Sequence, residues 1–571
     1  MTMLTKWGAA LDRSCPLPEY PRPQLRRESF YNLNGVWDYA VTPSGDEPEV
    51  WDGEIVVPFS PEAPLSGAAR GPAKDEYLHY RRGFTLPEGF QKSRVLLHFG
   101  AVDQIAEVFV NGVSAAKHSG GYWPFSADIT SLLREGENIL RVTVRDNADD
   151  PTFAYGKQRY KRGGMWYTAQ SGIWQTVWLE SVPEVYVKSL RITPEFDEAR
   201  VRIELETALE SSAAITCDVR AADGSFVAGS WAKGGVCVVP LPGFRAWTPD
   251  DPYLYTLDIT CGEDHVESYF AMRKFSYVEL GGHKVFGLNN APLFHNGLLD
   301  QGYYPDGLLT PPSDEAMVND IETMKRCGFN MLRKHIKIEP LRWYYHCDRL
   351  GMIVWQDMVS GGQPYSFLHV SALPTLGKVD FPDQDAKPYG RSGVLSRARF
   401  RREMADTVRL LYNCPCIALW TVFNEGWGQF DALDMANELK KLDPTRFIDH
   451  ASGWQDQGYE EMKSRHIYFR PVKLKNDGRA LALTEYGGYI LAVDGHRWTD
   501  KVFGYRICRN SAALAHDYEK LMLGQVLPHI RKEGLTAAVY TQITDVEEEL
   551  NGLMTYDREV LKIPEETLRE I

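Results

Sequence analysis

The segment CIALWTVFNEGWGQF, residues 416–430, decides how the C-terminal half of the chain is interpreted. It stays apolar for the length of a strand and then stops at Asn424 and Glu425, before the turn-forming letters GWG. A buried strand that ends at a carboxylate is typical of the catalytic edge of a barrel. The simpler interpretation is that Glu425 caps the helix that follows, and the spacing alone does not decide between the two.

Around this segment, residues 276–571 alternate between strand-like and helix-like patterns. Helix patterns cover 313–328, 395–414 and 429–443, and the first opens with a Ser-Asp cap and stops at Gly328. Eight β units in about 295 residues predict a (β/α)8 TIM barrel. The strands are expected at 292–297, 330–335, 352–358, 416–424, 447–452, 465–469, 480–485 and 536–543.

Two β-rich regions precede the predicted barrel. Residues 1–183 form apolar or alternating runs of strand length, and Asn111-Gly112 marks a tight hairpin, so a jelly-roll sandwich is predicted. Residues 184–275 hold about seven short strands, which suits an immunoglobulin-like β-sandwich. The sequence therefore predicts three domains, with the barrel domain at 276–571.

The composition of the 571-residue chain excludes several classes of function. Its net charge is −14 and no basic stripe is present, so nucleic acid is not an expected partner. No run of 18 apolar residues occurs, so no membrane span is expected. The first 15 residues lack the apolar core of a signal peptide, which predicts a cytoplasmic protein.

The nine cysteines, scattered from Cys15 to Cys508, are predicted to be buried thiols in a reducing compartment. Cys414 and Cys416 are too close together for a zinc knuckle and have no second pair. No metal and no cofactor are therefore expected.

A second carboxylate strengthens the functional interpretation of Glu425. Glu485, in ALALTEYGGY (residues 480–489), ends the predicted seventh strand, and the carboxyl ends of barrel strands face one shared mouth. Hydrolysis of a glycosidic bond uses such a pair, one as proton donor and one as nucleophile or base. Asn424 could then donate to a sugar hydroxyl, and Trp427 and Tyr468 could wall the pocket.

These segments resemble glycoside hydrolase family 2, which includes the bacterial β-galactosidases and β-glucuronidases. TVFNEGWGQF and LTEYGGY are similar to its acid/base and nucleophile segments. VFVNGVSAAKHSGGYWPFSADIT resembles its sugar-binding-type jelly roll, AWTPDDPYLYTL its middle sandwich, and GFNMLRKHIKIEP its barrel. The resemblance covers nearly the whole chain, with ordered signatures in all three domains.

The resemblance implies a role for each matching residue. Glu425 would be the general acid/base and Glu485 the nucleophile, with retention of configuration, and Asn424 would bind the 2-hydroxyl of the sugar. Further substrate-binding residues are implied where the motifs match: His335, Tyr468, Arg333, Asp300, Asp146 and Tyr540, the last in place of a family tryptophan.

The chain departs from the family pattern at several points. The region after the third strand, WQDMVSGGQPYS, lacks the histidine that accompanies magnesium in the large β-galactosidases. Gly487-Gly488 replace a histidine that follows the nucleophile in other members. Both departures argue against a magnesium site and against the pocket of the large enzymes.

A second departure concerns glucuronidases, which bind the sugar carboxylate partly through an Asn-x-Lys pair. Here Asn551 is followed by Gly552 and Leu553, so this contact is missing. Basic residues near strand ends could take a uronate by another route, although such residues are more often solvated or paired with carboxylates. The candidates are Lys334, Lys337 and Arg470.

Two long loops border the predicted mouth. Residues 359–396 follow the third strand, and residues 487–506 follow the seventh. Loops of this length are usually functional or disordered. Their aromatic residues could cover the mouth or could only anchor the loops: Tyr365, Phe367, Phe381, Tyr389, Trp498 and Tyr505.

The sequence therefore favours a retaining exo-β-glycosidase that acts on a β-galactoside-like sugar without a cofactor. A β-hexuronidase, acting on glucuronides or galacturonides, is the first alternative, and an inactive glycan-binding protein is the second. A metal-dependent barrel hydrolase is disfavoured because no tight His/Asp cluster is visible. The expected partner is a carbohydrate or glycoconjugate, and family members commonly form homo-oligomers.

Overall fold

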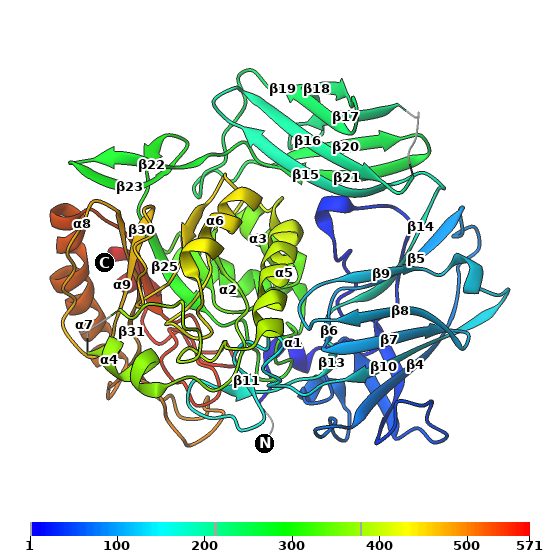
Figure 1. The fold of residues 1–571 in the computed structure, drawn as a ribbon, viewed down its shortest axis with the longest axis horizontal. Helices are drawn as coiled ribbons and strands as arrows, with labels where there is room; N and C mark the ends of the chain where they lie inside the picture. Colours follow the sequence, from blue (N-terminus) through cyan, green and yellow to red (C-terminus); the bar gives the residue numbers. More distant parts are fainter. Residues whose placement is uncertain (1–2, 210–213, 377–379) are drawn as a thin grey trace.

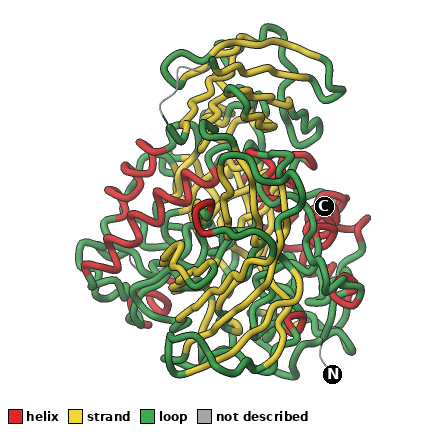
Figure 2. Tube along the Cα trace, turned by 90° about the vertical axis from the view of Figure 1, so that its right-hand side faces the viewer, coloured by secondary structure: helices red, strands yellow, loops and turns green. Residues whose placement is uncertain are grey.

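The computed structural model describes residues 3–209, 214–376 and 380–571. Three parts are visible in Figure 1: a blue and cyan β-sandwich, a green and teal β-sandwich above it, and a helix-flanked barrel that runs from green to red. Within residues 3–183, the only α-helix is α1 (Lys6–Ala9), which begins after Thr5. Figure 2 shows that strands dominate both sandwiches, whereas helices gather around the barrel.

The first sandwich packs a four-stranded sheet against a six-stranded sheet around an apolar core. The β7–β8 hairpin turns at Asn111 and Gly112, which have φ of 50° and 83°, so the predicted tight hairpin is present. In sheet order, the strands are β1 (Phe30–Asn32), β14 (Val177–Val182), β5 (Arg94–Phe99) and β9 (Phe125–Asp128) in one sheet. The other sheet holds β3 (Gly53–Val57), β2 (Gly35–Thr42), β4 (Tyr77–Thr85), β10 (Glu137–Arg145), β7 (Ile105–Val110) and β8 (Val113–Ser119).

Short strands extend from this sandwich toward the barrel. They are β6 (Val102–Asp103) paired with β13 (Gly172–Ile173), and β11 (Gln158–Arg159) paired with β12 (Tyr167–Thr168). The segment that carries β11 contacts the barrel directly, because Ala154 forms a β-bridge with Gly361. The first domain therefore contributes a loop to the barrel surface.

The second sandwich has seven strands in two antiparallel sheets, as expected for an immunoglobulin-like domain. One sheet orders β15 (Val187–Glu195), β16 (Arg200–Thr207) and β19 (Val236–Pro240). The other orders β18 (Phe226–Trp231), β17 (Ile215–Arg220), β20 (Tyr255–Cys261) and β21 (Asp264–Phe270). All nine cysteines are free and eight are buried, Cys15 being exposed, so burial of the thiols was correctly predicted for eight of them.

A small sheet closes one end of the barrel. It consists of β22 (Phe275–Leu280), β23 (His283–Leu288) and β24 (Ala291–Pro292). Phe286 stacks on Phe447 at 4.3 Å and packs against Trp355 at 5.8 Å between ring centroids. Because Phe447 begins its strand, this sheet covers the amino ends of the barrel strands and leaves the carboxyl ends open.

The barrel is an eight-stranded sheet in which every neighbouring pair is parallel. It is nearly closed, since the outermost strands β29 and β30 lie side by side without a ladder of hydrogen bonds. All eight predicted strands are present, and the first and sixth are displaced by three residues. The observed strands are β25 (His295–Asp300), β26 (Met331–Lys334), β27 (Ile353–Asp357), β28 (Ile417–Thr421), β29 (Phe447–Asp449), β30 (Met462–Ile467), β31 (Ala480–Gly487) and β34 (Leu535–Thr541).

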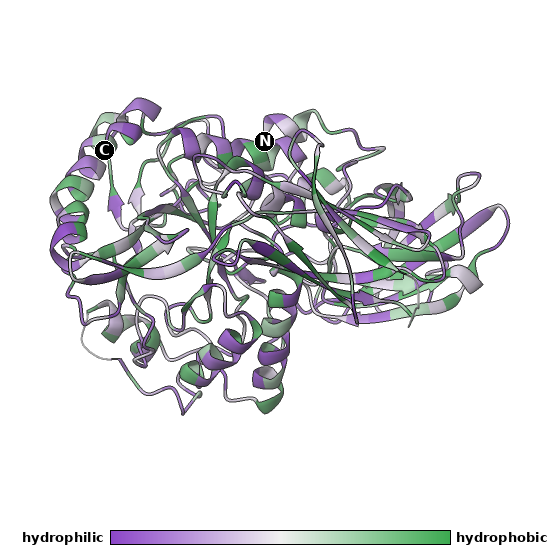
Figure 3. Ribbon diagram, turned by 90° about the horizontal axis from the view of Figure 1, so that it is seen from above, coloured by the Kyte–Doolittle hydropathy of each residue, from purple (hydrophilic) through white to green (hydrophobic). Residues whose placement is uncertain are grey.

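Helices cover the outside of the barrel and alternate hydrophilic and hydrophobic residues, as Figure 3 shows. Ser313 caps α2 by accepting from the Ala316 N–H at 3.2 Å, as the sequence predicted. The helices are α2 (Asp314–Arg326), α3 (Leu341–Leu350), α4 (Leu373–Thr375), α5 (Val394–Leu411), α6 (Ala432–Leu442), α7 (Ser511–Leu521), α8 (Leu527–Glu533) and α9 (Glu565–Glu570). A short β32 (Tyr489–Ile490) pairs with β33 (Arg506–Ile507) at the rim.

Helix α6 decides the first question that the sequence raised. It begins at Ala432 after Asp431, so Glu425 lies seven positions before the helix and cannot cap it. The capping interpretation is wrong, and Glu425 is free for another role. Among the described residues, no helix is both long enough and apolar enough to cross a membrane.

Candidate active site

Glu425 lies at the mouth of the barrel, the end formed by the carboxyl ends of the strands. It follows β28 by four residues, and its N–H donates to the Ser452 carbonyl at 2.9 Å. Its φ is 53°, in the left-handed region, which costs a residue with a side chain about 1–2 kcal/mol. Such strain is often retained at functional sites. Gly426 and Gly428 also have positive φ, and at Gly428 a Cβ would lie 2.6 Å from the Arg391 guanidinium.

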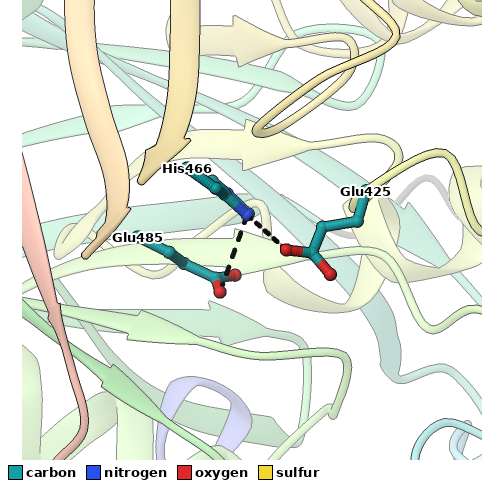
Figure 4. A group of neighbouring side chains, drawn as sticks. All are labelled: Glu425, His466 and Glu485. Carbon is teal, nitrogen blue, oxygen red and sulfur yellow. Dashed lines mark hydrogen bonds and ion pairs between the residues drawn. The ribbon is translucent and has the colours of Figure 1, made fainter. Parts of the chain in front are cut away.

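Glu425, Glu485 and His466 meet at the centre of this mouth, as Figure 4 shows. One oxygen of each carboxylate and one imidazole nitrogen all lie within 4.8 Å of one another. His466 Nδ1 is 2.8 Å from Glu425 Oε1 and 3.6 Å from Glu485 Oε2. The nearest carboxylate oxygens of Glu425 and Glu485 are thus no more than 4.8 Å apart. This spacing is close to the roughly 5–5.5 Å between the carboxyl groups of retaining glycosidases and well below the roughly 6.5–9.5 Å of inverting ones.

The two carboxylates differ in their surroundings. The Glu425 side chain is 24% exposed and that of Glu485 only 7% exposed. Burial raises the pKa of Glu425 to about 7, against the opposing charges of Lys157 and Arg333. A carboxyl group with this pKa is partly protonated near neutral pH and can donate a proton.

Glu485 lies deeper and is bound by cationic and hydroxyl donors. Arg333 donates to its Oε1 at 3.0 Å, and the Tyr468 hydroxyl donates to its Oε2. Burial raises the pKa of Glu485, whereas His466, Arg333 and Tyr468 oppose the rise. These donors stabilise the ionised form that a nucleophile requires.

The Arg333 side chain is fully buried and contacts Glu485 of β31 and Asn424, the residue before Glu425. Its Nε and Nη2 donate to the two oxygens of Asp357, each at 3.0 Å, and Nη2 also donates to Asn424 Oδ1 at 2.8 Å. The Asn424 carbonyl oxygen is therefore held toward Arg333, which turns the NH2 of the amide the other way. Arg333 acts as a positioning residue and is not a wall of the pocket.

His335 is held in one orientation by the same carboxylate. Its Nδ1 lies 2.7 Å from Asp357 Oδ2, and the residue is 2% exposed. Burial lowers the pKa of His335 to about 3, although Asp357 opposes this shift. The imidazole is therefore neutral, with its Nδ1–H donated to Asp357.

The sequence interpretation missed His466 and Thr541. His466 lies on β30, two residues before Tyr468, so the two side chains share one face of the strand. Burial lowers the pKa of His466 to about 4, so the neutral ring donates from Nδ1 to Glu425 while Nε2 can accept from the Ser452 hydroxyl at 3.2 Å. Thr541 Oγ1 lies 2.9 Å from the Tyr468 hydroxyl. The period of two along a strand was the signal that could have identified His466 from Tyr468, whereas the prediction on β34 fell on Tyr540, the neighbour of Thr541.

Three residues implied by the resemblance do not join this group. Asp300 Oδ2 accepts from Lys334 at 2.6 Å, in the layer between β26 and α3, where Lys334 also lies over the Trp343 ring. Asp146 is 2% exposed inside the first sandwich, and burial together with the charge of Asp103 raises its pKa. These two predictions are wrong because motif matching fixes a position in the chain but not the direction of the side chain.

Tyr540 is the third misplaced residue. It is fully buried and packs at 5.0 Å against Tyr518 of α7, on the outer face of the barrel. Trp427 is nearer to its predicted place but is 5% exposed, and it packs at 5.1 Å against Trp166 and at 5.8 Å against Tyr155 of the first sandwich. Trp427 therefore joins the two domains at the mouth.

The basic residues proposed for uronate binding are mostly engaged elsewhere. Lys334 and Lys337 are each 1% exposed, and both donate to Glu339 Oε1, at 2.8 and 2.9 Å. Lys337 also donates to the backbone carbonyls of Gly302 and Leu309. Arg470 is exposed beyond the end of β30. Pairing, the less specific interpretation of the two lysines, therefore agrees with the structure.

The rim loops use their aromatic residues in different ways. Tyr389 anchors its loop, because it is 1% exposed and its carbonyl accepts from the Gly428 N–H at 2.9 Å. Tyr505 stacks on Tyr468 with 3.9 Å between ring centroids, and Phe367 is 71% exposed. Part of the predicted 359–396 loop, residues 377–379, lies outside the described residues.

The same three residues, Glu425, His466 and Glu485, offer ligand atoms close enough for a metal ion. The expectation that no compact cluster of histidine and carboxylates would occur is therefore corrected. However, Arg333 and Tyr468 already donate to Glu485, and a buried guanidinium 3.0 Å from one ligand opposes a second cation. The arrangement fits a pair of reacting carboxylates better than a cation site.

Comparison with known proteins gives three family matches in chain order. Models of the glycosyl hydrolases family 2 match residues 64–183 (sugar binding domain), 185–273 (family 2) and 311–474 (TIM barrel domain). A β-galactosidase of Halalkalibacterium halodurans is 23% identical over 500 residues, covering 80% of this chain and 45% of that protein. A β-glucuronidase of Paenibacillus borealis is 22% identical over 535 residues, covering 83% of this chain and 85% of that protein.

The chain spans less than half the length of the β-galactosidases it matches from Halalkalibacterium halodurans and Thermoanaerobacter pseudethanolicus, 45% and 47% respectively. Solved structures agree in fold over nearly the whole chain. A β-glucuronidase of an uncultured Clostridium species has a TM-score of 0.75 at 19% identity, covering 96% of this chain and 98% of that one. A Bifidobacterium dentium β-glucuronidase complexed with coumarin-3-O-glucuronide has a TM-score of 0.75 at 18% identity, covering 96% and 97%.

Proposed function

Because the chain belongs to glycoside hydrolase family 2, we propose that it hydrolyses terminal β-linked sugars with retention of configuration. The observation that carries this proposal is the close approach of Glu425 and Glu485 around His466 at the open end of the barrel. Two unlike carboxylates at this distance match the requirements of a double displacement at an anomeric carbon.

In the first step, Glu485 attacks the anomeric carbon while Glu425 gives its proton to the glycosidic oxygen. The C–O bond to the leaving group breaks, and an ester between the sugar and Glu485 forms. Asn424, oriented by Arg333, is positioned to donate to the sugar hydroxyl next to the reacting carbon. In the second step, Glu425 takes a proton from water, and the water oxygen releases the sugar from Glu485.

The change of role of Glu425 follows from the charges around it. In the free protein, burial keeps its pKa near 7, so a useful fraction is protonated. Once Glu485 is esterified, its negative charge disappears, and the pKa of Glu425 falls because repulsion between the two carboxylates is lost. Glu425 is then ionised when it must act as a base.

The test is to replace each carboxylate separately. Glu485→Ala and Glu425→Ala are each expected to lose most turnover of an aryl β-glycoside, about 10³-fold or more in kcat. Azide should restore activity only to Glu425→Ala on an activated substrate, because it replaces water in the second step without needing a base. The first product seen by NMR should be the β-anomer.

Two results would overturn the proposal. One is wild-type turnover in both variants, and the other is the α-anomer as first product. The inactive glycan-binding alternative predicts no release from any chromogenic β-glycoside, and it is disfavoured because both carboxylates are intact and convergent.

The sugar itself is a finer proposal. The sequence favours a β-galactoside-like substrate because the Asn-x-Lys pair of glucuronidases is missing. A β-hexuronide is the second candidate. One observation supports it: Lys157 of the first sandwich lies in a segment held against the strand ends, and none of the described carboxylates pairs with it.

A further inference from the structure

We propose that Lys157, carried to the barrel mouth by the first β-sandwich, binds an anionic group on the sugar and so selects hexuronide-type substrates. This inference rests on the proposed function, since it concerns the same site. It differs from the Asn-x-Lys contact because the cation comes from another domain. Contacts hold the 155–164 segment against the barrel, and the neighbouring cations Arg159 and Arg162 are paired with carboxylates, whereas Lys157 is not.

The backbone around Lys157 is pinned to the barrel. The N–H groups of Tyr155 and Gly156 both donate to the Ser360 carbonyl, at 3.1 and 2.9 Å, just beyond the end of β27. The Tyr155 hydroxyl donates to the Gly362 carbonyl at 2.7 Å. A Cβ on Gly156 would lie 3.0 Å from the Ile336 carbonyl, just beyond β26. The backbone at Lys157 therefore lies next to the ends of the second and third strands.

The other side of the segment is tied to the eighth strand. The Lys157 carbonyl accepts from the Tyr167 N–H at 3.0 Å, within the β11–β12 pairing. The Tyr167 hydroxyl donates to Glu549 on the loop after β34. These contacts fix the position of residue 157 between the second, third and eighth strands, so the lysine is not on a free surface loop.

Lys157 differs from the other cations of its segment. Arg159 lies 3.6 Å from Asp149 and over the Trp166 ring, and Arg162 lies 3.4 Å from Glu547 and over the Trp498 ring. Lys161 is exposed, whereas Lys157 is half-buried. Within residues 3–209, 214–376 and 380–571, no carboxylate oxygen lies within 4.0 Å of the Lys157 ammonium.

The charge of Lys157 acts on groups at three strand ends. It opposes the burial that raises the pKa of Glu425 and of Glu549, and it adds to the burial that lowers the pKa of His335. These residues follow the fourth, eighth and second strands, so the charge of Lys157 acts among the strand ends at the mouth of the barrel. A cation near a proton donor lowers the pKa of that donor, and an anionic group on the substrate would offset this effect.

A carboxylate on the sugar would provide this neutralisation. An ammonium group is a compact point charge that can pair with a carboxylate at the far end of the ring, and partial burial strengthens such a pair. The bound anion would also cancel the field that favours ionised Glu425, so the acid would be protonated when the substrate is present. Sulfated or phosphorylated hexosides carry the same type of charge and must be distinguished by experiment.

The experiment compares the wild type with Lys157→Met, Lys157→Arg and the matched control Lys161→Met. Substrates are the 4-nitrophenyl β-glucuronide, β-galacturonide, β-glucoside and β-galactoside, and the 6-sulfated β-galactoside. The wild type should prefer a uronide over the neutral sugar of the same configuration. Lys157→Met should lose roughly 10- to 150-fold in kcat/KM on the uronide, the equivalent of one charged hydrogen bond.

Several further readouts test the role of Lys157. Neutral glycosides should change by less than about threefold in Lys157→Met at a pH well below 7, since they carry no anion that contacts Lys157. Lys157→Arg should retain an intermediate preference, Lys161→Met should behave as the wild type, and free uronate should inhibit the wild type more than Lys157→Met. Thermal unfolding checks that each variant is folded, and uronate inhibition of the wild type tests the contact without any variant.

The outcomes separate the two proposals. No release from any β-glycoside would contradict the proposed function itself. Turnover of neutral glycosides with no preference for uronides, or equal losses on both classes in Lys157→Met, would overturn the role of Lys157 alone. Preference for the 6-sulfated sugar over both uronides would overturn the assignment of a carboxylate while retaining an anionic substrate.

Discussion

Replacing Arg333 by methionine should disable the active site and destabilise the barrel at the same time. Methionine has a similar length but no charge and no N–H group. The Arg333 side chain is 0% exposed, and its guanidinium donates to Asp357, Glu485 and Asn424 at 2.8–3.0 Å. Its removal leaves two carboxylates buried without their cation and releases the amide that faces the sugar.

The expected loss of stability can be bracketed in two ways. Deleting one partner of a buried ion pair costs about 3–5 kcal/mol. Although burial raises the pKa of Asp357, Arg333 and His335 hold it at about 2 instead of 3.8, and a shift of nearly two units corresponds to about 2–3 kcal/mol. We therefore expect the free energy of unfolding of the barrel to fall by about 3 kcal/mol at pH 7.

The loss of stability in Arg333→Met should also depend on pH, in a direction that the pKa of Asp357 fixes. The pKa of Asp357 is lower in the folded state, so its stabilising contribution is complete above its unfolded pKa near 3.8 and is lost as the pH falls toward 2. The difference between the wild type and Arg333→Met should therefore be largest near neutral pH and should shrink below pH 4. Urea unfolding, followed through the tryptophans of the barrel, measures both values.

Arg446→Met is the matched control for this prediction. Arg446 is also buried in the barrel, but it pairs with Asp443 at 2.7 Å and donates to the Ile417 carbonyl at the amino end of β28, away from the mouth. Arg333→Met should lose about 10³-fold or more in kcat/KM on an aryl β-glycoside, because the nucleophile and the substrate-binding amide both lose their alignment. Arg446→Met should lose stability but little activity at temperatures where it is folded. More than a tenth of wild-type kcat/KM in Arg333→Met, with an unchanged unfolding midpoint, would refute the reasoning.

Two further predictions concern Glu425. The value of kcat/KM should fall as the pH rises through about 7, because burial raises the pKa of Glu425 to about 7 and its proton is needed in the first step. A pH–rate profile in which kcat/KM does not fall between pH 6 and 8 would contradict this prediction. Glu425→Gln should be inactive, but at pH 8 it should be more stable than the wild type by about 1–3 kcal/mol. The reason is that the pKa of Glu425 is higher in the folded state than its unfolded value of 4.5, so ionisation of this carboxyl destabilises the folded protein. This gain should be complete above about pH 7 and absent below 4.5, and a gain that is the same at pH 5 and pH 8 would contradict it.

The sequence could predict the barrel and its two carboxylates because both depend on position along the chain. A strand pattern fixes where a parallel strand ends, and strand ends meet at one face of this fold. Glu425 and Glu485 follow from that rule alone, without knowledge of any contact. The capping interpretation of Glu425 failed because the chain needs six residues of glycine-containing turn before α6 begins.

Residues that depend on side-chain direction were predicted less well. Tyr540 and Thr541 are neighbours on β34, yet Tyr540 faces α7 and Thr541 contacts Tyr468. A shift of one residue reverses the face of a strand, so an inexact motif match cannot decide between them. The same rule, applied to Tyr468, would have indicated His466 two residues earlier.

Contacts between domains were beyond the reach of the sequence pattern. Lys157 lies in an irregular segment of the first sandwich, and tertiary contacts such as the packing of Gly156 against Ile336 and Ser360 bring it to the barrel. Nothing in the spacing of KQRYKR distinguishes Lys157 from Lys161. The difference between a half-buried cation and an exposed one arises from tertiary structure.

The barrel and the first sandwich therefore contribute different parts of the site. The barrel supplies both carboxylates and buries them, which raises the pKa of Glu425 and Glu485, and it adds Arg333, whose charge opposes the rise at Glu485. Lys157 works against protonation of Glu425, so in the free protein the two domains have opposing effects on the acid. In the complex that we propose, an anionic sugar removes this opposition by pairing with Lys157, whereas a neutral sugar would leave it in place. Specificity and acid catalysis are then coupled through one charge, and Lys157→Met should raise the alkaline pKa of kcat/KM on a neutral glycoside while it lowers activity on a uronide.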